Sequence, residues 1–172
     1  YHRALGAEVA DLRMAMPVST RTGTSAGGNS FVPTRVLVPV HDDPVARFDE
    51  VHERLSATKS ERAIGIIGPV AGFANLLPTS VLVRFARAQT EAVDFPTSNV
   101  RAAPFELFIA GARIEGNWPL GPLAGTAFNL TMMTYCGVRN MGLHVDSGAV
   151  TDPELLQRCL ETSFGELIAA SR

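Results

Sequence analysis

Apolar and polar positions alternate, or apolar positions run on, in six short segments of the chain, which is the pattern of half-buried or buried β-strands. The predicted strands are residues 12–21, 31–40, 95–100, 106–115, 126–135 and 138–145. The first runs into a loop over residues 22–30, which are rich in Gly, Ser and Thr. Cys136–Gly137 separates the last two strands and predicts a tight antiparallel hairpin.

The strand predicted over residues 126–135 has two different faces. Phe128, Leu130 and Met132 fall on one face, and Asn129, Thr131, Met133 and Tyr135 fall on the other. In residues 106–115, the alternation places four apolar side chains on one side of a single strand: Phe108, Ala110, Ala112 and Ile114.

Other segments repeat apolar residues at the spacing of a helix. One helix is predicted to begin at Pro44 behind the N-cap Asp43, and the last one at Pro153 behind Asp152. A further helix is predicted over residues 76–92. Residues 1–11 resemble the end of a helix that began earlier, which suggests a piece of a longer protein.

The order of these elements, β-β-α-α-β-β-β-β-α, predicts an α/β (α+β) domain. Its sheet is expected to be mixed or largely antiparallel, with the helices packed on it. The 172 residues suit one domain, and an apolar fraction of 46% is enough for a core.

The charge and the cysteine content restrict the classes of function that the sequence favours. The formal net charge is −2 and Lys59 is the single lysine, so the sequence gives no indication of nucleic-acid binding. Cys136 and Cys159 lie far apart and are interpreted as two buried free thiols, with a structural disulfide or a catalytic thiol as the alternatives. The apolar tract over residues 63–86 is interrupted by Pro, Gly and Asn, which favours two short interface-seeking helices over a membrane span.

No stretch of the sequence matches a known catalytic pattern well. His144, Asp146 and Ser147 could begin a triad, but no GxSxG turn accompanies them, and a strand end with a solvated Asp is the plainer interpretation. No metal-ligand spacing is present, and the Gly-rich stretches do not match phosphate-binding loops. Four methionines on predicted strands are expected to fill the core or to line an apolar pocket: Met14, Met16, Met132 and Met133.

Polar residues within the predicted strands indicate a candidate site more clearly than the catalytic and metal-binding patterns do. Asn129 must find a partner if it is buried, either in a neighbouring backbone or in a ligand cavity. Ser98 and Asn99 could donate hydrogen bonds to an oxyanion, or they could bracket a turn before a strand.

Several stretches in order resemble one family. "LRMAMPVSTR", "GGN" and "FVPTRVLVPV" are similar to the PVS-x-R, GN and LP run of the bacterial wax ester synthase/diacylglycerol acyltransferases (WS/DGAT). "SNVRAAPFELFIAGARIEGNWPLGPL" and the residues that follow resemble the C-terminal signature of that family. The resemblance covers roughly residues 10–170. Two departures are Arg101-Ala-Ala-Pro104 after Asn-Val, and Trp118 where the family has Tyr.

The resemblance implies one half of a two-domain fold of the chloramphenicol acetyltransferase-like superfamily. The catalytic His of that superfamily lies in an HHxxxDG motif of the N-terminal half, which this sequence lacks. Residues 1–172 are therefore expected to be the C-terminal half, with no catalytic residue of their own and no activity alone. They would form one wall of the substrate tunnel of an acyl-CoA-dependent O-acyltransferase. A non-catalytic lipid-binding or assembly domain of a degenerate paralogue is the alternative.

The same resemblance supplies candidate site residues. Ser98 and Asn99 match the Ser-Asn-Val segment and would stabilise the oxyanion, while Asn129 and Tyr135 would line the cleft. Arg21 would be structural or would meet CoA phosphates. The remaining matched positions are taken as structural: Gly28, Asn29, Pro119, Gly121 and Pro122.

The implied partners are acyl-CoA as co-substrate, diacylglycerol or a fatty alcohol as acceptor, and the N-terminal half of the same enzyme. No bound cofactor, metal or nucleic acid is expected. The implied location is the cytoplasm, with peripheral contact at the inner membrane or at lipid droplets.

Overall fold

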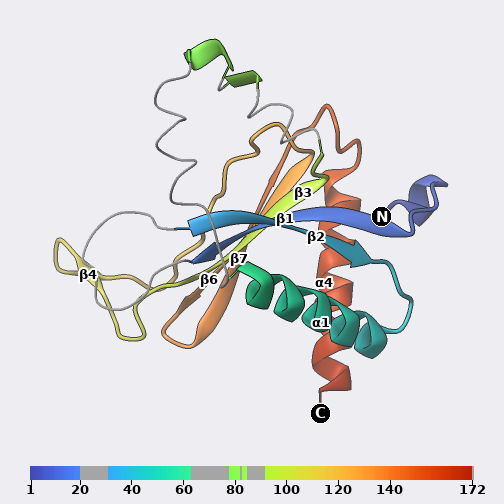
Figure 1. Cartoon of the computed structure of the whole chain (residues 1–172). Helices are drawn as coiled ribbons and strands as arrows, with labels where there is room; N and C mark the ends of the chain where they lie inside the picture. The colour runs from blue at the N-terminus through green and yellow to red at the C-terminus, as the bar shows by residue number, and fades with distance from the viewer. Residues whose placement is uncertain (20–30, 63–77, 82, 85–91, 172) are drawn as a thin grey trace.

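A five-stranded sheet forms the centre of the domain (Figure 1). The computed structural model describes residues 1–19, 31–62, 78–81, 83–84 and 92–171. Along the sheet the strand order is β2-β1-β3-β6-β7. The strands are β1 (Asp11–Ser19), β2 (Phe31–Pro39), β3 (Phe95–Arg101), β6 (Phe128–Tyr135) and β7 (Val138–Val145).

The sheet consists of two antiparallel pairs joined by one strand. β1 pairs with β2 along its whole length, and β6 pairs with β7 in the same way. Between them, β3 runs parallel to β1 on one side and to β6 on the other, over shorter stretches. Most residue pairs in the sheet are therefore antiparallel, and the predicted mixed, largely antiparallel α/β architecture is confirmed.

The β6–β7 hairpin has the turn that its sequence predicts. Tyr135 pairs with Val138, which leaves Cys136 and Gly137 as the turn residues. Their φ angles are 47° and 81°, the left-handed pair of a type I′ turn, whose twist matches that of the flanking strands. Gly137 adopts this angle without strain because it has no Cβ.

Both long helices pack on one face of the sheet (Figure 1). They are α1 (Pro44–Arg62) and α4 (Pro153–Ala170). Each begins as predicted: the Asp43 carboxylate accepts the Ala46 N–H at 2.7 Å, and the Asp152 carboxylate accepts the Leu155 N–H at 2.8 Å.

The helix-covered face carries much of the apolar core. Met14 of β1, Val36 of β2 and Leu156 of α4 are buried. Phe95 and Phe128 stack with ring centroids 4.8 Å apart. A cavity of about 530 Å³ remains between the sheet and α4. No helix among the described residues is both long and apolar enough to cross a membrane.

Three predicted elements differ in the structure. Residues 106–115 are not one strand, because Ala110 and Gly111 adopt left-handed φ angles of 49° and 84°. β4 (Phe108–Ile109) therefore folds back onto β5 (Ala112–Arg113), and Phe108, Ala110, Ala112 and Ile114 do not share one strand face. Only Arg3–Leu5 of the predicted N-terminal helix is helical, as a 3-10 turn that Gly6 ends at φ 77°.

The third difference concerns the predicted helix over residues 76–92, of which residues 79–81 and 83–84 are helical. The rest of that helix lies outside the described residues, apart from Pro78 and Ala92, which are not helical. Most of the apolar tract 63–86 and the loop 22–30, with Arg21, Gly28 and Asn29, also lie outside them.

Candidate functional site

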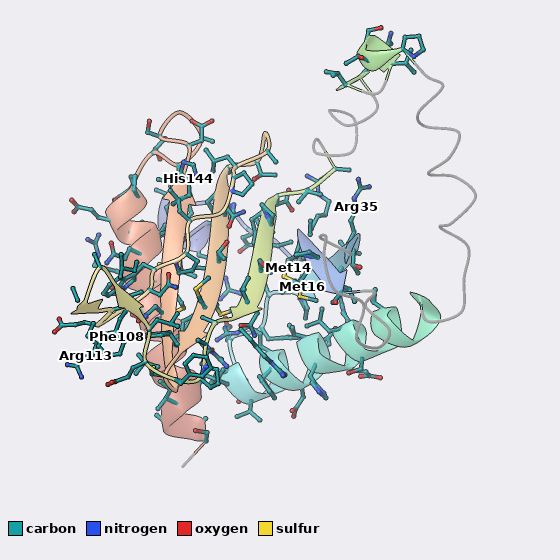
Figure 2. All side chains as sticks on the ribbon, turned by 90° about the vertical axis from the view of Figure 1, so that its left-hand side faces the viewer. Met14, Met16, Arg35, Phe108, Arg113 and His144 are labelled. Atoms are coloured by element: carbon teal, nitrogen blue, oxygen red, sulfur yellow. The ribbon has the colours of Figure 1, made fainter. Side chains whose placement is uncertain are left out.

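The sheet face opposite the helices, the outer face, carries the candidate site. Residues 102–127 connect β3 to β6 by crossing this face, and they include β4 and β5; we call them the cover segment. Figure 2 views the molecule from this side, with Phe108 and Arg113 near one end of the sheet and His144 near the other. Strand alternation places Asn129, Thr131 and Tyr135 of β6 on the outer face.

Side chains of β6 and β7 bind the backbone of the cover segment. Asn129 Nδ2 donates to the Pro122 carbonyl at 2.8 Å, and Asn140 Nδ2 donates to the Asn117 carbonyl at 3.1 Å. The Nδ1 of His144 lies 2.9 Å from the Gly121 carbonyl, so this nitrogen carries the proton. These bonds hold the turn that contains Pro119, Gly121 and Pro122 against the sheet.

Tyr135 holds the other end of the cover segment. Its hydroxyl accepts the Leu107 N–H at 2.9 Å and donates to the Ile114 carbonyl at 3.1 Å. Leu107 and Ile114 flank the β4–β5 hairpin, and the Ile114 N–H donates to the Leu107 carbonyl at 2.9 Å. The Tyr135 hydroxyl therefore links the two sides of the hairpin at its base.

Two glycines allow the cover segment to approach the strands closely. A Cβ on Gly142 of β7 would lie 1.6 Å from the Pro119 carbonyl oxygen, so any other residue there would displace the backbone above it. A Cβ on Gly121 would lie 2.4 Å from both Asn129 Oδ1 and Thr131 Oγ1. At these two positions the cover segment therefore lies in direct contact with the strands.

Asn129 and Tyr135 are consequently buried beneath the cover segment in this chain. Their exposed fractions are 5% and 3%. Asn129 Oδ1 also accepts the Thr131 hydroxyl at 2.7 Å. Of the two alternatives for Asn129, the structure shows the one in which it satisfies a neighbouring backbone. Pro119, Gly121 and Pro122 form the turn that this bond holds in place.

Ser98 and Asn99 lie inside β3 rather than before a turn. Ser98 pairs with Thr131 and Asn99 with Met132, so the two side chains project to opposite faces of the sheet. Ser98 lies on the outer face and is half-buried, while Asn99 lies on the helix face and is exposed. Among the described residues, no hydrogen bond to either side chain is found. Only one of the two can therefore enter any single site.

Beyond the covered half, none of the described helices or connections crosses the outer face. We call the outer face of β2, β1 and β3 the open half. Leu37 and Val100 project from it with exposed fractions of 53% and 40%. Ser98 lies at the boundary between the open half and the covered half, where the cover segment lies over β6 and β7.

An ion pair between Arg13 and Asp94 links two strands of the open half. Arg13 Nη2 lies 2.6 Å from Asp94 Oδ1, and the Arg13 N–H donates to Asp94 Oδ2 at 2.7 Å. This pair joins β1 to the residue before β3. The hydrogen bonds and charge of Arg13 lower the pKa of the Asp94 carboxyl, against a smaller opposing effect of burial.

The triad suggested by His144, Asp146 and Ser147 does not assemble. His144 is bound to the cover segment, while Asp146 Oδ1 accepts the Gly148 N–H at 2.8 Å in the exposed loop after β7. The plainer interpretation, a strand end with a solvated Asp, is therefore the one that the structure supports. Cys136 and Cys159 are both free thiols, as predicted, but the prediction that both are buried is wrong, because Cys136 is exposed in the β6–β7 turn and Cys159 is half-buried.

Asn140 and Gly142 belong to the same arrangement, and the sequence analysis overlooked both. A signal was present, because Asn and Gly are disfavoured inside strands, and an interior Gly often marks the close approach of another backbone. Both positions lie in the middle of β7.

Comparison with known proteins places this arrangement in a family. The model of the WS/DGAT C-terminal domain matches residues 27–168, which include all of the cover segment and the sheet strands β2 to β7. The chain belongs to the WS/DGAT C-terminal domain family.

The WS/DGAT domain has curated relatives in Mycobacterium tuberculosis. One protein named as a diacylglycerol O-acyltransferase is 34% identical over 171 residues, which is 98% of this chain but 35% of that protein. A second, named likewise, is 29% identical over 166 residues, 88% of this chain and 36% of the relative. The chain therefore spans about a third of the length of the curated relatives it matches.

Two solved structures share the fold of the WS/DGAT domain. The wax ester synthase/diacylglycerol acyltransferase of Marinobacter aquaeolei matches with a TM-score of 0.66 and 18% identity, over 97% of this chain and 38% of that one. The starter condensation domain of rhizomide synthetase matches with a TM-score of 0.55 and 13% identity, over 98% and 38%. The expected chloramphenicol acetyltransferase-like fold is thus confirmed.

Proposed function

We propose that this chain is the C-terminal half of an acyl-CoA-dependent O-acyltransferase that makes triacylglycerol or wax esters from diacylglycerol or a fatty alcohol. The family match over residues 27–168 carries the proposal. The sequence contains no HHxxxDG motif, so the general base would come from the N-terminal half. This chain would supply one wall of the substrate tunnel and would have no activity alone.

The proposed reaction is transfer of an acyl group from sulfur to oxygen. A histidine of the N-terminal half takes the proton of the acceptor hydroxyl, and the oxygen attacks the thioester carbonyl carbon. The tetrahedral intermediate carries an oxyanion. When it collapses, the C–S bond breaks, and the CoA thiolate leaves with the proton that the histidine returns.

Ser98 is our candidate for the oxyanion donor. It lies on the outer face, at the boundary where the cover segment ends and the open half begins. Its hydroxyl has no hydrogen-bond partner among the described residues, so it is available to a ligand. Asn99, on the other face of β3, would then act only by supporting the strand.

The first test measures acyl transfer from radiolabelled acyl-CoA to diacylglycerol by the full-length protein, with Ser98→Ala, Asn99→Ala and the exposed-loop control Ser147→Ala. Removal of one oxyanion-hole donor costs roughly 10²–10³ in kcat. We expect Ser98→Ala to lose kcat on that scale with little change in KM, and Ser147→Ala to remain active.

The outcomes separate the alternatives. Full kcat in Ser98→Ala, with Asn99→Ala impaired, would move the donor role to the other face of β3. Activity in the isolated chain would overturn the division of labour between the two halves. A full-length protein that binds lipid but transfers no acyl group, despite an intact HHxxxDG, would favour the non-catalytic paralogue.

The proposed location is the cytoplasm, with peripheral contact at the inner membrane or at lipid droplets. The support is the water-insoluble character of the proposed acceptors. Residues 63–86, which the sequence suggested for this contact, lie mostly outside the described part of the chain.

A further inference from the structure

The cavity between the sheet and α4 has a largely apolar wall. Its volume of about 530 Å³ lies within the range of ligand pockets, roughly 300–1,000 Å³. Several large apolar side chains of the wall are only half-buried, although they lie between the sheet and the helix: Leu12, Phe95, Phe128, Leu130 and Leu160. An apolar ligand would remove these side chains from water, which favours its binding.

The cavity follows one stripe of α4. Leu156, Cys159, Leu160 and Ser163 line it, at the i, i+3, i+4 and i+7 positions that share one face of a helix. With a rise of 1.5 Å per residue, Leu156 and Ser163 are roughly 10 Å apart along the helix axis. The stripe begins with the buried Leu156 and ends with the hydroxyl of Ser163. Its length and its change of polarity suit a ligand with an apolar chain and a polar head.

A cation lies at the Ser163 end of the cavity. Arg47 of α1 lines the cavity, and its Nη2 lies 3.9 Å from a carboxylate oxygen of Glu166, on the next turn of α4. Its Nη1 donates to the His41 carbonyl at 2.9 Å. A charge-assisted hydrogen bond is shorter than the contact with Glu166, at about 2.7–2.9 Å. A ligand carboxylate could therefore approach Arg47 more closely than Glu166 does.

The other charges at the cavity do not oppose an anion. Arg3 is paired with Asp42, and Glu50 is paired with His41. Among the described side chains that line the cavity, two arginines face one aspartate, which leaves one excess positive charge with the histidines neutral. This charge balance favours an anionic head group at Arg47.

We propose that this cavity binds a medium-chain fatty acid, with the chain along the α4 stripe and the carboxylate on Arg47. The inference goes beyond the proposed function, because a free acid is neither the acyl donor nor the acceptor. The cavity also lies on the opposite face of the sheet from Ser98. The bound acid would contact α1, α4 and the sheet together, so it would stabilise the folded domain.

The two cysteines provide a readout in the full-length protein. Cys159 lines the cavity, whereas Cys136 is exposed in the β6–β7 turn and serves as the internal control. Alkylation by iodoacetamide is followed by mass spectrometry of the peptides that contain each cysteine. With dodecanoate at about ten times its Kd, we expect Cys159 to react about tenfold more slowly, because only the unoccupied fraction reacts. Cys136 should react at an unchanged rate.

The variant Arg47→Gln tests the contact with the carboxylate. Its matched control is Arg158→Gln, because Arg158 also lies on a helix, with its carboxylate partner Glu154 at 3.8 Å. We expect Arg47→Gln to raise the Kd of dodecanoate about tenfold, through loss of a hydrogen bond between charged groups. Arg158→Gln should bind like the wild type. Dodecanol, which lacks the carboxylate, should have the same Kd for Arg47→Gln and the wild type.

A filled cavity completes the test. Leu160→Trp places a larger side chain in the middle of the stripe and should abolish dodecanoate binding. If this variant does not fold, the comparison of Arg47→Gln with Arg158→Gln decides.

Three results would overturn the site. Unchanged alkylation of Cys159 up to the solubility limit of dodecanoate would show that the cavity is closed in the full-length protein. Equal Kd values for Arg47→Gln and Arg158→Gln would remove the carboxylate from Arg47. Protection of Cys159 by dodecanoyl-CoA but not by dodecanoate would assign the cavity to the acyl donor. All of these measurements are independent of acyl transfer, so their failure is distinguishable from failure of the proposed function.

Discussion

The two halves of the outer face differ in how they are covered. Over β6 and β7, the polar side chains Asn129, Tyr135, Asn140 and His144 are bonded to the cover segment, and Gly142 lets it lie directly on the strand. Over β1 and β2, Leu37 remains exposed, and the ion pair between Arg13 and Asp94 is at the surface. Polar residues inside the strands therefore bind the cover segment on one half, whereas on the other half an apolar side chain and an ion pair lie at the surface of the described structure.

The largest loss of stability is expected when a substitution at Gly142 disrupts the contact between the cover segment and β7. In Gly142→Ala, the new Cβ would collide with the Pro119 carbonyl, so the cover segment must lift. We expect a loss of about 3 kcal/mol or more in the free energy of unfolding, measured by urea unfolding.

Gly165→Ala in α4 is the matched control for Gly142→Ala. No atom lies within 4 Å of its added Cβ, and alanine favours the helix, so the control should gain about 0.5–1 kcal/mol. Equal effects of the two substitutions would contradict close contact between Pro119 and β7.

A smaller loss in the free energy of unfolding should follow from Asn129→Ala. The substitution leaves the Pro122 carbonyl and the Thr131 hydroxyl without their partner in a buried site, at a cost of about 2–3 kcal/mol. Hydrogen exchange should accelerate in the cover segment and stay unchanged in β1.

Asn140→Ala provides the comparison for Asn129→Ala, because Asn140 is only half-buried and makes one such bond, to Asn117. We expect this variant to lose about 1 kcal/mol in the free energy of unfolding. If Asn129→Ala proves the milder of the two, the buried network is not what holds the segment.

The smallest loss of stability should come from Asp94→Asn, a substitution in the open half. The pKa of Asp94 is lower in the folded state, so its contribution is complete above the unfolded value of about 3.9 and is lost as the pH falls below it. The variant should have a Tm about 1–3 °C lower at pH 7, because an exposed pair contributes little.

The acid limb of the stability curve gives the second measurement on Asp94→Asn. Its Tm should fall less steeply than that of the wild type below about pH 4. Parallel curves for the two proteins would show that the ion pair with Arg13 does not persist in solution.

Local signals in the sequence predicted the elements well. Asp43–Pro44 and Asp152–Pro153 marked the helix starts, because capping uses residues three positions apart. Cys136–Gly137 marked the hairpin for the same kind of local reason. The alternation that continued through Ala110–Gly111 misled the prediction of residues 106–115, since two left-handed residues reverse the chain without interrupting the pattern.

The roles of the site residues were harder to predict, for a physical reason. Asn129, Tyr135 and His144 bind backbone carbonyls in a connection that has little regular structure. Every residue has a backbone carbonyl, so the order of side chains in the sequence does not predict these partners. The opposite orientation of Ser98 and Asn99, in contrast, follows from the strand already predicted over residues 95–100, and could have been stated from the sequence.

The bonds that anchor the cover segment have a consequence for protein engineering. They join strand side chains to main-chain atoms of the segment, so they specify its path without specifying the side chains it displays. Phe105, Phe108, Ile109, Trp118 and Leu120 all point into solvent. These positions could be randomised in a library on a fixed backbone, provided that Pro119, Gly121, Pro122 and Gly142 are kept. The domain would then serve as a scaffold whose displayed loop is exchanged independently of its fold.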